Sequence, residues 1–258
     1  MKIDFKWIGA ACFILEIDKQ FKIACDPSLS PKGTLYDFKY FKSERTFGPE
    51  YEASDFKDVD LWLLTHNHLD HLDNDGISVL NQESVKLCHP NVVKKLAEKE
   101  LDHIDSVSWG EHRSFSKYDI SINVTVVPAV HGSNFITSYL AGGVNGYWLE
   151  IRKGDQEKQI YITGDTVCHE VLEKHIGNKI CDVLIPNMGA VRSDHFGGPL
   201  TMNSDMLSHM IDCFEPLAVL PIHYGCFTHY TEGFPELDLS HRSKVRKTTR
   251  GKNIELTV

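Results

Sequence analysis

The chain has 258 residues, of which 41% are hydrophobic, and this is enough to bury a sizeable core. Its 27 basic and 36 acidic side chains give a formal charge of −9, which argues against a polyanionic partner such as nucleic acid. Seven cysteines without a CxxC pair, a hydrophilic start and the lack of a membrane-spanning apolar run predict reduced thiols, a cytoplasmic location and a single domain over residues 1–258.

The first quarter of the chain predicts successive strands followed by a long loop. Apolar side chains alternate or cluster in residues 5–8, 13–17 and 21–26, and Asp26 before a proline ends the third strand. Residues 28–56 then lose any period but are rich in aromatic side chains, and loops this long are usually functional. We expect either a flap that supplies an apolar wall for a substrate, or else a packed surface loop or a dimer contact in a homo-oligomer.

A dense cluster of potential metal ligands follows the next predicted strand. Residues 61–64 form an apolar run, and His66, His68, Asp70 and His71 lie within six positions just after it. Imidazole nitrogen is the commonest protein ligand of zinc, and carboxylate oxygen binds harder divalent ions. The first two histidines stand two apart in an extended segment and point to the same side, so both reach one ion. The last two ligands lie past the strand end, where the chain aims them at a neighbouring ion. The spacing therefore suggests two metals.

The remaining chain alternates between predicted strands and helices. In chain order we expect a helix start at 73–80, a strand at 85–88, a helix at 91–101, strands at 119–130, 147–151 and 158–163, a helix at 167–176, a strand at 182–186, a helix at 204–214, and strands at 217–222 and 253–258. Strands that come early and then mix with helices suggest two sheets with helices outside them. The basic segment 241–252 is either a phosphate or nucleic-acid patch or a solvated run before the last strand.

The pattern His-x-His-x-Asp-His after an apolar strand resembles the signature of the metallo-β-lactamase fold superfamily of metal-dependent hydrolases. Members take three further ligands from distant loops, and His131, Asp165 and His223, each after an apolar run, occupy the matching places in this chain. The resemblance implies an α/β (α+β) fold arranged as a four-layer αββα sandwich. It also implies the following ligand sets: His66, His68 and His131 for one metal; Asp70, His71 and His223 for the other; and Asp165 as the bridge.

The chemistry of such a centre also follows from the resemblance. Two divalent cations that share a water lower its pKa from ~16 towards ~7, so a hydroxide nucleophile exists at neutral pH. Zinc is the expected metal for five imidazoles and two carboxylates, and manganese or iron accepts the same donors. Asp70 is also expected to take part in proton transfer. Asp26 is either a turn-capping residue or a hydrogen-bond acceptor for a ligand imidazole.

Two more histidines are candidates for catalysis. His195 and His229 lie in loops after predicted strands, where each either donates to a substrate oxygen or leaving group or has a structural role. The remaining histidines are expected to be ordinary surface or core residues. These are His89, His103, His112, His169, His175, His209 and His241.

The resemblance predicts hydrolysis of a small ester, lactone or phosphodiester. Residues 7–13 and 186–192 look like a branch that includes ascorbate-6-phosphate lactonase and the N-acylphosphatidylethanolamine-hydrolysing phospholipase D. That branch often carries a His-Met or His-Thr where residues 200–202 of this chain read Leu-Thr-Met, so no single substrate carries over. The alternatives are a nuclease similar to ribonuclease Z, which would need a larger positive face, and a metal-binding module without hydrolytic turnover.

Overall fold

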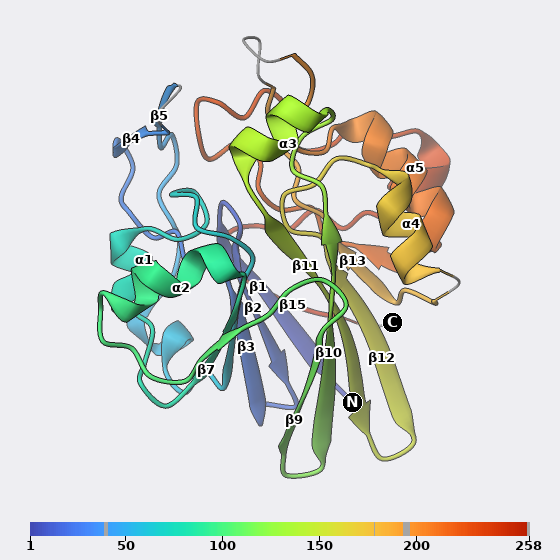
Figure 1. Ribbon diagram of the computed structural model, residues 1–258. Helices are drawn as coiled ribbons and strands as arrows, with labels where there is room; N and C mark the ends of the chain where they lie inside the picture. Colours follow the sequence, from blue (N-terminus) through green and yellow to red (C-terminus); the bar gives the residue numbers. More distant parts are fainter. Residues whose placement is uncertain (39–40, 178, 193–196, 257–258) are drawn as a thin grey trace. The chain divides into compact units, whose positions relative to one another are not determined.

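The structure is a computed structural model, and it describes residues 1–38, 41–177, 179–192 and 197–256 (Figure 1). The chain forms two compact units, and each is described by itself below. The described residues of 1–108, 226–228 and 248–257 form unit 1, and those of 109–225 and 229–247 form unit 2. The single domain expected over residues 1–258 stays a prediction.

Unit 1 is built on a seven-stranded sheet whose order is β15-β1-β2-β3-β6-β7-β8. The first three strands form an antiparallel meander, and β3, β6, β7 and β8 then run parallel to one another. The early strands and the strand before the histidine cluster are where the sequence predicts them, whereas β8 is not predicted and β15 is shorter than expected. The bounds are β1 Ile3–Gly9, β2 Cys12–Ile17, β3 Phe21–Cys25, β6 Leu61–Leu64, β7 Val85–Cys88, β8 Ile104–Ser106 and β15 Asn253–Glu255.

Short helices cover one face of this sheet. The 3-10 helix η1 spans Ala53–Phe56, α1 spans Asn74–Ser78 and α2 spans Pro90–Ala97. Trp62 and Leu64 of β6 share one buried cluster with Val92 and Leu96 of α2, so the apolar stripe of the helix meets the apolar strand. The helix ends before the predicted residue 101 because the residues after Ala97 are exposed and mostly charged.

The long segment 28–56 is more regular than the sequence predicts. It contains a hairpin of β4, Leu35–Asp37, and β5, Lys42–Glu44, whose tip at residues 39–40 lies outside the described part. Arg45 follows the hairpin, and its side chain is fully buried, donating to the carbonyl and the hydroxyl of Ser28. The aromatic side chains of this segment are divided between the interior and the surface, since Tyr36 is buried whereas Phe47 is exposed.

Unit 2 is built on a six-stranded sheet whose order is β14-β13-β12-β11-β10-β9. The strands from β9 to β12 pair antiparallel, and the pairings of β12 with β13 and of β13 with β14 are parallel. β14 is shorter than the predicted strand 217–222, but the backbone N–H groups of Leu220 and Ile222 continue the pairing by donating to the carbonyls of Leu184 and Pro186. The bounds are β9 His112–Lys117, β10 Ile120–Ala129, β11 Val144–Lys153, β12 Gln156–Ile162, β13 Val183–Ile185 and β14 Ala218–Val219.

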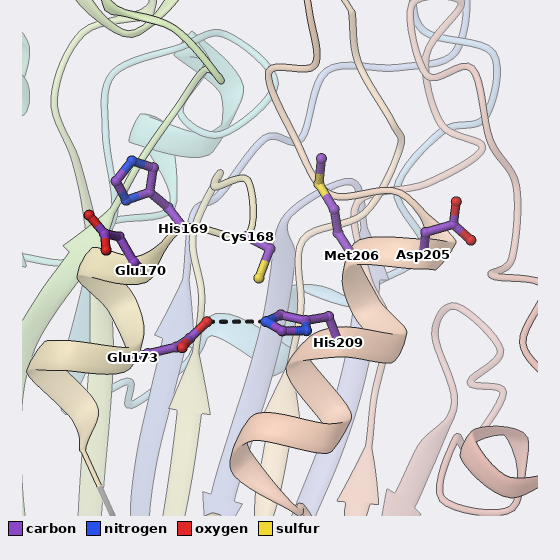
Figure 2. A pocket seen from close by; sticks show the side chains of 7 residues that line it. All are labelled: Cys168, His169, Glu170, Glu173, Asp205, Met206 and His209. Carbon is purple, nitrogen blue, oxygen red and sulfur yellow. Dashed lines mark hydrogen bonds and ion pairs between the residues drawn. The ribbon is translucent and has the colours of Figure 1, made fainter.

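The helices of unit 2 are α3 Phe135–Ala141, α4 Glu170–Ile176, α5 Ser204–Phe214 and α6 Leu239–Arg242. The ring of Phe214 packs edge-on against Tyr161 of β12 at 5.7 Å between centroids, which places α5 on the sheet. Glu173 of α4 faces His209 of α5 (Figure 2). The sequence predicts α4 and α5 but neither α3 nor α6, which lies partly in the basic segment 241–252. Among the described residues, every helix is too short or too polar to cross a membrane.

Asp73 joins α1 to the long segment of unit 1. One carboxylate oxygen caps the helix by accepting from the N–H of Gly76, and the other accepts from the N–H of Ser30 and the hydroxyl of Tyr36. The guanidinium of Arg45 lies 3.9 Å from this second oxygen, and both side chains are buried. Although burial by itself raises the pKa of Asp73, the hydrogen bonds outweigh it and lower the pKa below its ordinary value.

We predict that Asp73→Asn lowers the free energy of unfolding by about 2 to 4 kcal/mol. The carboxylate accepts hydrogen bonds from several donors, whereas the NH2 group of an amide would face at least one of these donors with its own N–H. The substitution also leaves the buried Arg45 without its counter-charge. Urea denaturation followed by circular dichroism measures the change. Asp75→Asn is the matched control, because Asp75 is exposed on the same helix and its loss should cost at most about 0.5 kcal/mol. Equal stability of the two variants would contradict the prediction.

Candidate metal centre

The histidine cluster of unit 1 lies in a tight turn at the carboxyl end of β6. The backbone N–H groups of His71 and Leu72 both donate to the carbonyl of His68, which folds the segment back on itself. Within this turn Nε2 of His66 lies 2.9 Å from Nδ1 of His68, and ligand atoms of Asp70 and His71 lie within 4.8 Å of each other. His66, Asp70 and His71 are buried, so the turn holds several ionisable groups away from water.

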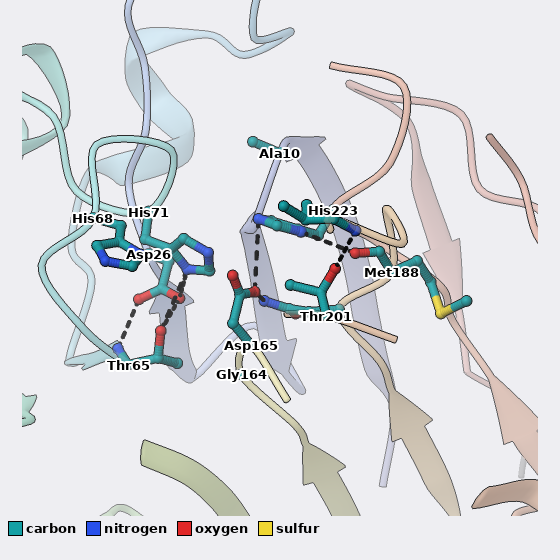
Figure 3. A network of polar contacts seen from close by, with 12 residues as sticks. Ala10, Asp26, Thr65, His68, His71, Gly164, Asp165, Met188, Thr201 and His223 are labelled. Carbon is teal, nitrogen blue, oxygen red and sulfur yellow. Dashed lines mark hydrogen bonds and ion pairs between the residues drawn. The ribbon is translucent and has the colours of Figure 1, made fainter. Parts of the chain in front are cut away.

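Asp26 and Thr65 fix the orientation of two of these rings (Figure 3). The carboxylate of Asp26, just after β3, accepts from the N–H and, at 2.6 Å, the hydroxyl of Thr65, and it lies 2.8 Å from Nδ1 of His71. Because the only hydroxyl proton of Thr65 goes to Asp26, its oxygen accepts from Nδ1 of His66 at 3.0 Å. His66 and His71 therefore both carry their proton on Nδ1 and present the lone pair of Nε2, the form that binds a metal. Asp26 thus has the supporting contact predicted for it.

Unit 2 gathers the other three predicted ligands around one carboxylate. Asp165 follows β12, His131 follows β10, and His223 follows the pairing that extends β14. Nε2 of His131 lies 3.8 Å from Oδ2 of Asp165, whereas Nε2 of His223 lies 3.6 Å from Oδ1. Each imidazole thus faces a different oxygen of the same buried carboxylate, which is the arrangement of a carboxylate that serves two neighbouring ions.

Backbone carbonyls orient these two imidazoles. Nδ1 of His131 donates to the carbonyl of Leu200 at 2.9 Å, and Nδ1 of His223 donates to the carbonyl of Met188 at 3.2 Å. A carbonyl oxygen only accepts, so each ring has a proton on Nδ1, and Nε2, which lies towards Asp165, is the nitrogen that a metal ion would bind. The amide of Asn187 donates to Oδ1 of Asp165 at 2.9 Å and holds the carboxylate in place.

The backbone is strained at two of these positions. Asp26 has a φ of +39° and His223 a φ of +60°, in the left-handed region that residues other than glycine seldom adopt. Each stands where a strand ends and the chain turns sharply, and each places a buried polar side chain. Conformations of this kind persist when the surroundings dictate them, and they concentrate at functional sites.

The donor atoms suit divalent metal ions in both units. Neutral imidazoles with a fixed Nε2 lone pair and ionised carboxylates are the ligands of zinc, and manganese and iron accept the same set. The hydrogen bonds to the far ring nitrogens fit this use, because metal-binding histidines usually donate their other N–H to a carboxylate or a carbonyl.

Of the two further catalytic candidates, His195 and His229, the structure describes only His229. His195 lies outside the described residues. His229 is half-buried, and its ring stacks edge-on with Tyr230 at 4.6 Å, while Tyr230 in turn lies 4.4 Å from the ring of His223. This contact places His229 one aromatic ring away from a predicted ligand, and its catalytic role stays a prediction.

Several supporting residues have no signal in the sequence. Thr65 stands next to the motif, but a hydroxyl side chain there gives no sign of a supporting role. Asn187 is 22 positions from Asp165, to which it donates. The acceptors at Leu200 and Met188 are backbone carbonyls, which any residue type provides. The fold, rather than the sequence, brings Asn187 and the two carbonyls beside the predicted ligands.

Comparison with known proteins shows what the chain is similar to. A family model described as the β-lactamase superfamily domain matches residues 22–224. A metal-dependent hydrolase of Pyrococcus abyssi (strain GE5 / Orsay) is 27% identical over 262 residues, covering 98% of this chain and 100% of the relative. The N-acyl-phosphatidylethanolamine-hydrolyzing phospholipase D 1 of Caenorhabditis elegans is 24% identical over 251 residues, or 93% of this chain and 68% of the relative. A crystal structure of a possible metal-dependent hydrolase from Veillonella parvula DSM 2008 aligns with a TM-score of 0.79 at 21% identity, covering 98% and 99% of the two chains.

We predict that Asp26→Asn weakens metal binding by about 10- to 100-fold. The amide lacks the charge that favours the Nδ1–H form of His71, and it competes as a donor with the N–H and hydroxyl of Thr65. Competition with a chelator of known affinity measures the change. Asp60→Asn is the control, because Asp60 is also a carboxylate of unit 1 that accepts from a backbone N–H, that of Lys22. Equal metal affinity of Asp26→Asn and the unaltered protein would refute the assigned role of Asp26.

Proposed function

Because the chain belongs to the β-lactamase superfamily of metal-dependent hydrolases, we propose that it is a dinuclear hydrolase of a small ester, lactone or phosphodiester. The family match and the structural likeness confirm the predicted metallo-β-lactamase fold and the predicted hydrolase class. The observation that carries the dinuclear proposal is the carboxylate of Asp165, which presents a different oxygen to each of His131 and His223.

The proposed ligand sets combine the groups of both units. His66, His68 and His131 would hold one ion, Asp70, His71 and His223 would hold the other, and Asp165 is the proposed ligand of both. Support comes from within each unit: the ring nitrogens of His66 and His68 converge at 2.9 Å, close to the ~3.3 Å that two nitrogens on one tetrahedral zinc would show. Zinc is the proposed metal, and manganese and iron fit the same donors.

The side chains of this centre have separate tasks. Two cations held by these residues would lower the pKa of a bound water towards ~7 and would neutralise charge that develops on the substrate. Asp165, held by Asn187, keeps a fixed negative charge between the two ligand sets. Asp70, which is buried, is the proposed group for proton transfer, and His229 is the proposed donor to a leaving group.

The aromatic hairpin of unit 1 supports a substrate with an apolar part. Phe38 lies edge-on to the ring of His68 at 6.5 Å between centroids, and Phe41 stacks on Phe38 at 4.9 Å. Phe41 and Leu35 are exposed, so the hairpin carries apolar surface next to a proposed ligand. This contact favours the flap over the alternative of a packed surface loop. The phospholipase D relative is named for a lipid phosphodiester, which is a substrate of this chemical kind.

A panel of substrates tests the proposed reaction. The protein, loaded separately with zinc and manganese, is assayed against bis-p-nitrophenyl phosphate, simple lactones, an aryl ester and a short RNA. We expect turnover of an ester, a lactone or the phosphodiester and none of the RNA, because a chain with a formal charge of −9 repels a polyanion. Cleavage of RNA alone would replace the proposal with a nuclease, and no turnover on any substrate with both metals bound would favour a metal-binding module.

We predict that His68→Ala lowers kcat by about 100-fold or more and reduces bound metal from two equivalents towards one. The substitution removes one ring from the pair that converges on the first ion and leaves the buried turn otherwise intact. Steady-state kinetics and elemental analysis of the same preparation measure both effects. His112→Ala is the control, since His112 is exposed on β9 and its loss should change neither quantity. Wild-type turnover at reduced metal content would show that the mechanism is wrong.

The flap makes a separate prediction about specificity. Phe41→Ala should raise KM for a substrate with a long apolar chain by about fivefold, from the loss of roughly 1 kcal/mol of apolar contact, while KM for a short-chain substrate stays within twofold or so. Tyr118→Ala is the control, because Tyr118 is an aromatic residue that is even more exposed than Phe41 and lies in the turn between β9 and β10. The same KM for both chain lengths in the Phe41 variant would remove the flap from the substrate site.

A further inference from the structure

A second group of metal-binding side chains lies in unit 2, apart from the seven predicted ligands. It borders a hollow of about 400 Å³ between the start of α4 and the outer face of α5 (Figure 2). Neither the sequence pattern nor the resemblance assigns a function to these residues, and His209 is expected from the sequence to be an ordinary surface residue. The hollow is lined by Cys168, His169, Glu170, Glu173, Asp205, Met206 and His209.

Three of the lining side chains lie close together, and a fourth side chain, that of Cys213, contacts one of them. Ligand atoms of Cys168, Glu173 and His209 all lie within 4.8 Å of one another. Nε2 of His209 is 3.1 Å from Oε1 of Glu173, and the same nitrogen is 3.4 Å from Sγ of Cys213. Glu173 belongs to α4, whereas His209 and Cys213 stand four residues apart on one face of α5.

The geometry argues against a nucleophilic cysteine. In a Cys-His-Glu triad the thiol and the carboxylate contact opposite nitrogens of the imidazole, so that a proton passes across the ring. Here Glu173 and Cys213 both contact Nε2 of His209. Burial, together with the nearby Cys213 and Glu173, also raises the pKa of Cys168 to about 11, so without a cation this thiol is protonated at neutral pH and a poor nucleophile.

The thiol, carboxylate and imidazole groups of this cluster face one another, and a single proton cannot satisfy them all. A cation would suit such a cluster. Two thiolates and a carboxylate repel one another when they are ionised, and a divalent ion removes that repulsion while it displaces the thiol protons. The spacing fits zinc, since ligands on a tetrahedral zinc are roughly 3.3 to 3.8 Å apart and the two distances given above are 3.1 and 3.4 Å.

We propose that Cys168, Glu173, His209 and Cys213 form a second metal site that binds Zn²⁺ or another thiophilic divalent cation. The donor set of two sulfurs, one nitrogen and one oxygen has four protein ligands and leaves no open position, which is typical of a structural rather than a catalytic site. Cys168 comes three residues after Asp165, so a cation here ties the segment that follows the bridging aspartate to α5.

Cadmium is the probe, because cadmium bound to thiolates absorbs in the near ultraviolet, whereas cadmium bound to imidazole and carboxylate alone does not. The full chain, kept reduced and stripped of metal, is titrated with Cd²⁺. We expect the absorption of two thiolates, which falls by half in Cys168→Ser and in Cys213→Ser and disappears in the double variant. Elemental analysis after loading with zinc should give one equivalent more for the unaltered chain than for the double variant.

Two matched pairs of variants separate this site from its surroundings. His209→Ala and Glu173→Gln should weaken cadmium binding by at least about tenfold. His175→Ala and Glu170→Gln should leave it unchanged, because His175 is exposed on α4 and Glu170, although it lines the hollow, pairs with Lys174 and lies outside the group of proposed ligands. His68→Ala should keep the full thiolate absorption, so loss of the hydrolase centre does not affect this readout. No thiolate absorption in the unaltered chain, or absorption that survives the double cysteine substitution, would overturn the proposal.

Discussion

The candidate centre depends on one kind of interaction, the hydrogen bond that four of the five predicted ligand imidazoles make through Nδ1. A free histidine exchanges its proton between two nitrogens and rotates about two side-chain bonds, so it loses entropy when it binds a metal. In unit 1 the acceptors are Asp26 and Thr65, and in unit 2 they are the carbonyls of Leu200 and Met188. These acceptors fix both the tautomer and the direction of Nε2 before any ion arrives, which is why they matter as much as the ligands themselves.

Parallel strand pairing places two of the groups that support the predicted ligands, Asp26 and Asn187. In unit 1, β3 and β6 run parallel, and the N–H of Asp26 donates to the carbonyl of Leu63, so that Asp26 ends up beside Thr65. In unit 2, β12 and β13 run parallel, and the N–H of Asn187 donates to the hydroxyl of Thr163, so that its amide reaches Asp165. Both units follow the rule that functional groups of parallel strands gather beyond their carboxyl ends.

The sequence predicts the ligands better than it predicts what orients them. His66, His68, Asp70 and His71 are close together in the chain, so their common purpose can be inferred without knowledge of the fold. Asn187 and the carbonyl of Leu200 act across gaps of 22 and 69 residues, and a carbonyl is the same for every residue type. The short strand β14 is a milder case, because the predicted strand 217–222 does pair with β13 although only its first part has regular strand geometry.

The proposed second metal site is equally hard to predict from the sequence. Cys168 and His209 are 41 positions apart and each looks ordinary in the sequence, so only the packing of two helices on one sheet shows that they converge. The two sets of donors also differ in softness, because the predicted hydrolase ligands are nitrogen and oxygen whereas this group contains two sulfurs. Manganese or iron would bind the first set but compete poorly for thiolates, whereas zinc would bind both. Two such sites would let a single chain hold different metals at the two places, so the metal found in a preparation has to be assigned to its ligands before it is assigned to the reaction.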